Sequence, residues 1–335
     1  MRSRVRANIY LVVLLLSVFG KLVAQDKDIR VHDPVMIEEN GTYYLFCTGN
    51  GISVFSSYDM VEWKREESVF DEPPAWTDSV VPGFKGHIWA PDISYYNGKY
   101  YLYYSVSAFG KNTSAIGLVT NKTLNAYDPS YKWEDQGVVV ESIPGRDLWN
   151  AIDPNLVEDE KGSPWLVFGS FWEGMKMFQL SSDRTAPKEP QQWITVAKRA
   201  RTDFIDDSKP GDAAIEAPFI FKKDGSYYLF VSWDYCCRGK ESTYKVVVGK
   251  SNNVTGPYMD KEGKRMDQGG GTLVVQGDDR WAGVGHNSAY TFNDKDYLVF
   301  HGYDLNSNGA PKLMIREISW TIDGWPQVEL EVAEQ

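Results

Sequence analysis

The sequence predicts an all-β fold, a five-bladed β-propeller, and three observations support this prediction. A short pattern recurs five times in the 335 residues, and successive copies of its central leucine lie 57, 64, 63 and 69 residues apart. The leucines are Leu45, Leu102, Leu166, Leu229 and Leu298. Repeats of about this length are typical of propeller blades or solenoid units. Turn signals recur about every dozen residues, and beyond residue 24 no long apolar stretch has the period of a helix.

Each repeat contains the strands of about one blade. A short strand, a tight turn and an aromatic-rich strand come first, and Asn40-Gly41, Asn97-Gly98, Lys161-Gly162 and Asp224-Gly225 mark the turns of four repeats. A further strand follows each hairpin, over residues 52–55, 116–119, 175–180, 244–248 and 313–318. This is the content of a propeller blade. A solenoid or a pair of β-sandwiches is the alternative, although stacked sheets have no reason to repeat one hairpin five times.

The N-terminus has the pattern of a secretory signal peptide. Three arginines in the first six residues precede an apolar run over residues 11–19, and small residues end the segment at Ala24. The run is too short to span a bilayer comfortably. We therefore expect residues 1–24 to be removed near Ala24, leaving one five-bladed propeller over residues 25–335. The mature protein is expected to be secreted or periplasmic, without a membrane span.

Charge and composition narrow the class of partner. The formal net charge is −11 at pH 7, and it becomes −15 without the four basic residues of the leader. Such a protein is expected to avoid nucleic acid and anionic surfaces, and to bind a neutral molecule. Aromatic residues make up 14% of the chain; most are expected in the core, and some could stack on sugar rings. We expect a monomer.

The three cysteines do not form a framework of disulfides or a metal site, because they are few and lack ligand spacing. Cys47 lies in an aromatic strand and is expected to be buried. The adjacent pair Cys236-Cys237 is expected to be two free thiols in a loop, with a vicinal disulfide as the alternative.

Carboxylates recur where the repeats begin. The first strands of all blades line the central channel in one direction, so equivalent residues form a ring at one end. Aligned on Pro34, Pro91, Pro154, Pro218 and Ser288, two aspartates (Asp33 and Asp153) stand one residue before the anchor, and His32, Trp89, Ile152, Glu216 and His286 stand two before it. One Asp-Pro pair would indicate only a turn. Crowded carboxylates raise the pKa of at least one member, which suits glycoside hydrolysis with one protonated and one ionised carboxyl.

Other catalytic schemes find no support in the sequence. There is no Gly-x-Ser-x-Gly elbow and no His-Glu-x-x-His motif. The glycines at 269–271 lack the lysine of a phosphate-binding loop and are expected to form a turn.

Taken together, the motifs resemble glycoside hydrolase family 43, and within it the endo-α-1,5-L-arabinanases. The resemblance covers about residues 31–325. It rests on HDP at 32–34, HIWAPD at 87–92, NAIDPN at 150–155, FGSFW at 168–172, AIEAPF at 214–219, CCRG at 236–239, STY at 242–244 and GHNS at 285–288.

The resemblance implies a five-bladed propeller that hydrolyses with inversion of configuration. It implies that Asp33 is the general base, that Glu216 is the general acid, and that Asp153 raises the pKa of the acid and orients it. The acid and base of an inverting enzyme lie about 6.5–9.5 Å apart to admit a water molecule. Asp33 and Glu216 are therefore expected to face each other across the channel.

The resemblance also implies a sugar-binding surface and an ion. The residues implied to contact sugar are Trp89, Asn150, Ile152, Ser170, Phe171 and Trp172, with hydrophobic packing as the alternative for Trp172. His32, which precedes the base, is expected to line the sugar-binding pocket, with a role in fixing the geometry of Asp33 as the alternative. One calcium ion is implied on the propeller axis beside His286, held largely through water. Because calcium prefers oxygen ligands, hydrogen bonding of His286 to the carboxylates is the alternative. Asp92 and His301 are expected to be structural.

The expected activity is internal cleavage of α-1,5-linked arabinofuranose chains, the plant cell-wall arabinan and its oligosaccharides. An exo-acting α-L-arabinofuranosidase or a β-xylosidase on the same fold is the alternative, since the loops that would close one end of the cleft cannot be read from sequence. A non-catalytic sugar-binding propeller is a further alternative. It would be expected to lack at least one of the three carboxylates, all of which are present.

Overall fold

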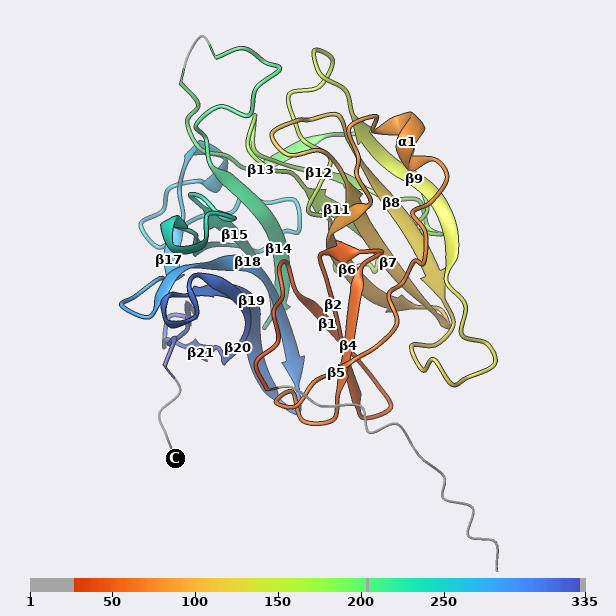
Figure 1. The fold of residues 1–335 in the computed structure, drawn as a ribbon. Coiled ribbons are helices and arrows are strands. Elements are labelled where there is room, and N and C mark those ends of the chain that lie inside the picture. Colours follow the sequence, from red (N-terminus) through yellow and green to blue (C-terminus); the bar gives the residue numbers. More distant parts are fainter. Residues whose placement is uncertain (1–26, 203–204, 332–335) are drawn as a thin grey trace, which may run out of the picture.

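The computed structural model describes residues 27–202 and 205–331, which form an all-β five-bladed β-propeller (Figure 1). The predicted leader lies outside the described residues. Blade 1 consists of β1 (Val35–Glu39), β2 (Thr42–Cys47), β4 (Ser53–Ser57) and β5 (Lys64–Arg65). Blade 2 consists of β6 (His87–Tyr96), β7 (Lys99–Val106), β8 (Ser114–Asn121) and β9 (Glu134–Ser142). Blade 3 consists of β10 (Asn155–Glu158), β11 (Pro164–Phe168), β12 (Met175–Gln179) and β13 (Ile194–Ala197). A short strand, β3 (Gly49–Asn50), pairs with β6.

Blades 4 and 5 complete the ring. Blade 4 consists of β14 (Ile215–Lys223), β15 (Ser226–Trp233), β16 (Lys245–Ser251) and β17 (Thr272–Gln276). Blade 5 consists of β18 (Trp281–Phe292), β19 (Lys295–Asp304) and β20 (Ala310–Glu317). β21 (Ser319–Trp320) and β22 (Pro326–Gln327) pair separately. The described helices are short: α1 (Thr77–Val80), η1 (Gly239–Glu241), η2 (Met266–Gln268) and η3 (Leu305–Ser307). None of the helices in the described ranges is long and apolar enough to cross a membrane.

The inner hairpins have one common register. The residue after each repeat leucine pairs with the first strand in the same way: Val35 with Phe46, Asp92 with Tyr103, Asn155 with Val167, Phe219 with Phe230 and Ser288 with Val299. The predicted primed turns are confirmed at Asn40-Gly41, Asn97-Gly98 and Asp224-Gly225, where both residues have positive φ. The fifth hairpin turns at Asn293 and Asp294, which also have positive φ.

This register corrects the alignment of the fifth repeat. Ser288 is equivalent to Val35 and not to Pro34, so the alignment on Ser288 is one residue off. His286 therefore stands at the position of Asp33 and Asp153 instead of the position of Glu216. The fifth repeat has no proline before its inner strand, and the sequence offered no other landmark for the register.

The hydrophobic core of the described residues consists of five clusters, one between each pair of neighbouring blades. All five repeat leucines are fully buried, and each lies in a different cluster. Full burial of one such side chain stabilises the fold by about 1.5–3 kcal/mol. The repeated leucine therefore marks, in the sequence, the interfaces between neighbouring blades.

The ring closes between blade 5 and blade 1. Ser288 donates its hydroxyl to the Pro34 carbonyl at 2.9 Å, and the Met36 N–H donates to the Tyr290 hydroxyl at 3.0 Å. Blade 5 has three strands in its sheet, and the chain before β1 lies beside β20, where the Leu313 N–H donates to the Ile29 carbonyl at 3.2 Å. The last blade therefore lies next to the first, as the ribbon shows (Figure 1).

Other inner strands are tied to the preceding blade in the same way as β1. Asp92 accepts from the Leu156 N–H at 2.8 Å, and Asn155 accepts from the Ile220 N–H at 2.9 Å. Asp92 also accepts from the Asn155 side chain at 3.1 Å, and burial raises its pKa to about 7. These contacts assign Asp92 the structural role that was expected.

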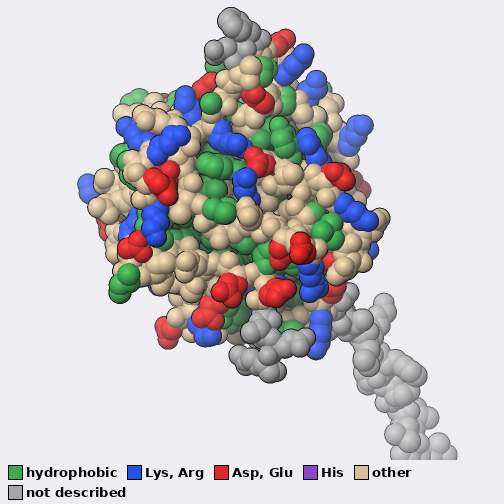
Figure 2. Space-filling model, turned by 90° about the vertical axis from the view of Figure 1, so that its left-hand side faces the viewer, with side chains coloured by type: hydrophobic (Ala, Val, Ile, Leu, Met, Phe, Trp, Pro, Cys, Tyr) green, Lys and Arg blue, Asp and Glu red, His purple; other side chains and the backbone are tan. Residues whose placement is uncertain are grey.

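The surface carries charges of both signs. On the side shown in Figure 2, acidic and basic side chains are interspersed, with hydrophobic side chains between them. The net negative charge of the chain is therefore not gathered into a single-sign field on this side.

We predict that Tyr290→Phe lowers the free energy of unfolding by about 1–3 kcal/mol, because the buried Met36 N–H loses its acceptor while the ring contacts remain. Urea denaturation measures this. Tyr95→Phe is the matched control, since the Tyr95 side chain is 55% exposed. Equal unfolding free energies for parent and Tyr290→Phe would contradict the proposed closure contact.

Candidate active site

The candidate site is built on five residues with left-handed backbone conformation, one at the start of each inner strand. They are Asp33, Ala90, Asp153, Ala217 and His286, with φ between 41° and 58°. Non-glycine residues in this region cost of order 1–3 kcal/mol each and persist only where the surroundings hold them. The same conformation in all five blades points to one shared means of support.

The support is a hydrogen bond from each left-handed N–H to a polar side chain. The bonds run from Ala90 to Thr48 Oγ1 (2.9 Å), Asp153 to Ser105 Oγ (2.9 Å), Ala217 to Asp153 Oδ2 (3.1 Å), His286 to Ser232 Oγ (2.9 Å) and Asp33 to His301 Nδ1 (3.2 Å). Four of these acceptors stand three residues after a repeat leucine, in the preceding blade. This role was not predicted from the sequence, although the polar residues at these places are its visible signal.

The third blade is the exception, because Gly169 occupies the supporting position. A Cβ there would lie 2.9 Å from the Gly174 carbonyl oxygen, and Gly169 has a φ of 133°. No side chain can therefore reach Ala217 from this place. Asp153 supplies the acceptor instead, so one of its carboxyl oxygens is committed to the backbone of blade 4.

Asp33 is surrounded by donors. Its Oδ1 lies 2.9 Å from His286 Nδ1, and its Oδ2 accepts a hydrogen bond from the Thr48 hydroxyl. Burial by itself would raise the pKa of Asp33, but His286, and then His301 and His32, hold it well below the usual range. Asp33 is therefore ionised at neutral pH, as a general base must be.

His286 lies among all three predicted catalytic carboxylates. Burial lowers its pKa, but the charges of Asp33, Asp153 and Glu216 outweigh burial and raise the pKa to about 9. The ring is therefore protonated at neutral pH and bonds directly to Asp33. This arrangement agrees with the alternative expected for His286, which is a hydrogen bond to a carboxylate.

Asp153 holds a proton near neutral pH. Burial raises its pKa to about 8, and the charges of Glu216 and Asp33 add to the increase, against the opposing effects of His286 and the Ala217 N–H. Two aspartates at equivalent positions of their blades are thus in opposite protonation states.

Glu216 is held by two hydroxyl groups. Tyr244 donates to Oε1 at 2.6 Å and Ser170 donates to Oε2 at 2.7 Å. Tyr244 is fully buried, and burial raises its pKa well above the ordinary value, so its hydroxyl stays a donor. The role of Tyr244 was not predicted, although it lies in one of the quoted motifs.

His301 links Asp33 to the Cys236-Cys237 loop. Because its Nδ1 accepts from the Asp33 N–H, the ring proton is on Nε2, which lies 3.2 Å from the Tyr303 hydroxyl oxygen. Burial lowers the pKa of His301 well below the ordinary value, so the ring is neutral. The Cys237 N–H in turn donates to the Tyr303 hydroxyl at 2.7 Å. His301 is therefore structural, as expected, and it positions Asp33.

Cys236 and Cys237 form a vicinal disulfide, which corrects the expectation of two free thiols. Cys237 has a left-handed backbone, and Tyr303 binds its N–H. This local conformation could not be read from the sequence. Cys47 is buried and free, as predicted.

The residues predicted to contact sugar differ in exposure. Trp89 and Phe171 are partly exposed. The Trp89 indole donates to His87 Nδ1 at 3.1 Å. The ring centroids of Phe171 and Tyr235 lie 6.0 Å apart. Trp172 is 1% exposed and donates to the Asp207 carbonyl, which favours the packing alternative. Three others are buried, namely Asn150, Ile152 and Ser170.

Two of the predicted contact residues have a buried polar atom without a partner. Asn150 Oδ1 and His32 Nε2 have no hydrogen-bond partner among the protein atoms described. His32 packs against His301, with ring centroids 4.7 Å apart, and burial lowers its pKa. Both atoms have unused hydrogen-bonding capacity close to the motifs of the site.

The residues around His286 do not form a cage for a metal ion. Within residues 27–202 and 205–331, no group of three or more His, Cys, Asp and Glu side chains has the arrangement of a metal site. His286 Nδ1 is bonded to Asp33. The calcium ion stays a prediction.

Comparisons with known proteins agree on one family. Residues 27–326 match the family model described as glycosyl hydrolases family 43. Extracellular exo-alpha-(1->5)-L-arabinofuranosidase ArbA of Cellvibrio japonicus is 55% identical over 310 residues, 92% of this chain and 89% of that protein. Extracellular endo-alpha-(1->5)-L-arabinanase 1 of Bacillus subtilis is 43% identical over 300 residues, 88% and 87% of the two chains. The structure of Cellvibrio cellulosa alpha-L-arabinanase complexed with arabinohexaose has a TM-score of 0.89 at 55% identity, covering 90% of this chain and 96% of that one.

We predict that His286→Gln raises the pKa of the Asp33 carboxyl toward its ordinary range, because the cation that lowers it is removed. A ¹³C NMR titration of aspartate carboxyls measures this without any substrate. Asp59 is the internal control, since neighbouring backbone N–H groups, and not a histidine, lower its pKa. An unchanged Asp33 titration would show that His286 does not set the ionisation of this carboxyl.

Proposed function

The chain belongs to glycosyl hydrolases family 43, and from this membership and the arrangement around His286 we propose that it hydrolyses the α-1,5 linkages of L-arabinan. The observation that carries the proposal is the gathering of Asp33, Asp153 and Glu216 around one protonated histidine. The three carboxyls differ in environment, which is what acid–base hydrolysis of a glycoside requires. A non-catalytic propeller would have no use for this costly cluster.

In the proposed reaction, Asp33 is the base. Its ionised carboxylate removes a proton from a water molecule, whose oxygen attacks the anomeric carbon from the face opposite to the leaving group. Thr48 and His286 fix the orientation of the carboxylate, and His301 holds the backbone N–H of the same residue. The new bond forms as the glycosidic bond breaks, so the configuration at the anomeric carbon is inverted.

Glu216 is the proposed acid, which donates a proton to the departing sugar oxygen. The charge of Glu216 adds to the effect of burial, which keeps a proton on the neighbouring Asp153 near neutral pH. Tyr244 and Ser170 hold the Glu216 carboxyl in a fixed orientation. In this proposal Glu216 enters the reaction protonated and transfers its own proton, and Asp153 positions it by accepting a hydrogen bond from the N–H of the next residue, Ala217.

The mode of attack is a separate part of the proposal. Internal cleavage is expected from the sequence motifs and is supported by the endo-acting relative at 43% identity. Cleavage from chain ends is supported by the exo-acting relative at 55% identity. Because the higher identity accompanies the exo name, we propose chain-end cleavage as the main mode, with internal cleavage as the second candidate.

The proposed substrate suits the other properties of the chain. Arabinan is neutral, and a protein with a formal charge of −11 does not repel it. Trp89 and Phe171, which are partly exposed, are the proposed stacking surfaces for furanose rings. Both relatives are named extracellular, and with the predicted leader this supports action outside the cytoplasm.

We predict that Glu216→Gln lowers kcat on linear arabinan by about 10²- to 10⁴-fold, because the amide cannot donate the proton. Release of reducing ends measures the rate. Glu262→Gln, at an exposed position, is the control and should keep the parent rate. Both variants should unfold at the parent temperature. A near-parent rate for Glu216→Gln would refute the assignment of the acid.

A timed product profile on linear arabinan separates the two modes. Chain-end cleavage gives short products of one length from the first minutes, while the long chains persist and the viscosity falls slowly. Internal cleavage gives an early ladder of oligosaccharides and a rapid fall in viscosity. We expect the first pattern; an early ladder would establish the endo mode instead.

A further inference from the structure

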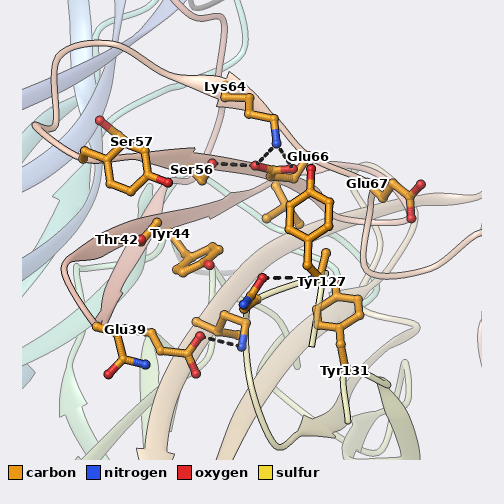
Figure 3. Close-up of a pocket in the computed structure, with 16 residues that line it drawn as sticks. Glu39, Thr42, Tyr44, Ser56, Ser57, Lys64, Glu66, Glu67, Tyr127 and Tyr131 are labelled. Carbon is orange, nitrogen blue, oxygen red and sulfur yellow. Dashed lines mark hydrogen bonds and ion pairs between the residues drawn. The ribbon is translucent and has the colours of Figure 1, made fainter. Parts of the chain in front are cut away.

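A pocket lies at the end of the propeller opposite to the carboxylates. Its volume is about 400 Å³, and it is formed between blades 1 and 2 (Figure 3). Asp33 lies two residues before the start of β1, whereas Glu39 and Asn40, at the other end of this strand, line the pocket. A five-residue strand spans about 17 Å. The pocket is therefore separate from the candidate active site.

Four tyrosines line this pocket. Tyr44 comes from β2, Tyr58 follows β4, and Tyr127 and Tyr131 belong to the loop after β8. Tyr58 and Tyr127 are 77% and 85% exposed. Exposed aromatic rings gathered at a pocket, unlike apolar residues scattered singly, mark an interaction site. In Figure 3, Tyr44, Tyr127 and Tyr131 surround the open space between the two blades.

The loop that carries two of these tyrosines is held in place. The Tyr127 N–H donates to Asn125 Oδ1 at 3.0 Å, and the Trp133 indole donates to the Tyr131 hydroxyl at 3.1 Å. Glu39 accepts from the Leu124 N–H at 3.0 Å, which ties the loop to β1. A rigid platform of this kind loses little conformational freedom when a ligand binds.

The charges of the pocket select against anions. Three carboxylates, Glu39, Glu66 and Glu67, accompany a single cation, Lys64. Lys64 is itself paired with Glu66 at 2.9 Å. An acidic polysaccharide or a phosphate would be repelled, whereas the hydroxyls of a neutral sugar can donate to carboxylate oxygens. Tyrosine rings supply the flat apolar surface against which the C–H faces of a sugar pack.

We propose that this pocket is a second saccharide-binding site, which holds part of a neutral glycan chain away from the catalytic centre. The class of sugar, arabinan, rests on the proposed function. A polymer held at both sites raises the effective concentration of its linkages near the carboxylates. A short oligosaccharide cannot reach from one site to the other and gains nothing from the pocket.

The test compares Tyr58→Ala/Tyr127→Ala with the parent on two substrates. The double variant should lose about threefold to tenfold in kcat/KM on polymeric linear arabinan, as expected for the loss of aromatic contacts. Its kcat/KM on arabinotriose should equal that of the parent. Equal losses on both substrates, or no loss on the polymer, would overturn the proposal.

Binding is measured directly by native electrophoresis in gels that contain linear arabinan, with Glu216→Gln in every variant to prevent hydrolysis. Retardation should weaken in Tyr58→Ala/Tyr127→Ala and persist in Tyr58→Phe/Tyr127→Phe, which keeps the rings. Tyr95→Ala, an exposed tyrosine outside the pocket lining, is the matched control and should migrate as its parent. Retardation that does not depend on the two tyrosines would overturn the second site. Absence of arabinan hydrolysis by the unmodified chain would refute the proposed function alone, because the gels report on the pocket independently.

Discussion

The candidate site depends on one backbone constraint, a left-handed residue at the start of each inner strand. Its N–H is bonded by a side chain, which in every blade comes from the blade before it. The same bonds therefore hold the blades together and set the functional groups at one end of the channel. Where the left-handed residue is alanine, as at Ala90 and Ala217, the candidate functional side chain stands one residue earlier, as Trp89 or Glu216.

Electrostatics then divides the roles within this frame. A single cation, His286, takes the position that an aspartate has in blades 1 and 3, and it interacts with three carboxylates. It pairs closely with Asp33 and keeps that group ionised, whereas Asp153 is dominated by burial and retains its proton. Asp33 and Asp153 occupy equivalent positions in their repeats, but their neighbours give them different protonation states. An acid and a base can therefore coexist in one small volume.

The sequence predicted the blades and the grouping of the carboxylates, because both follow from a repeat that is visible along the chain. It did not reveal the supports Thr48, Ser232 and His301, since their role appears only when one blade is placed against the next. The burial of Trp172 depends on a loop that reaches it from residue 207. The bond between Cys236 and Cys237 depends on a local backbone conformation that no composition or spacing specifies.

Gly169 has a consequence for how variants of this site are interpreted. Because it cannot supply an acceptor, Asp153 serves both as an ionisable group and as a support for the chain of blade 4. Removing its side chain deletes an ionisable group and a structural brace together, so lost turnover would mix chemistry with displacement of Glu216, the residue before Ala217. An isosteric amide, which keeps an oxygen for the Ala217 N–H, isolates the electrostatic share. Because residue 169 is glycine, the chemical role of Asp153 can be measured only with a substitution that keeps the hydrogen bond to the Ala217 N–H.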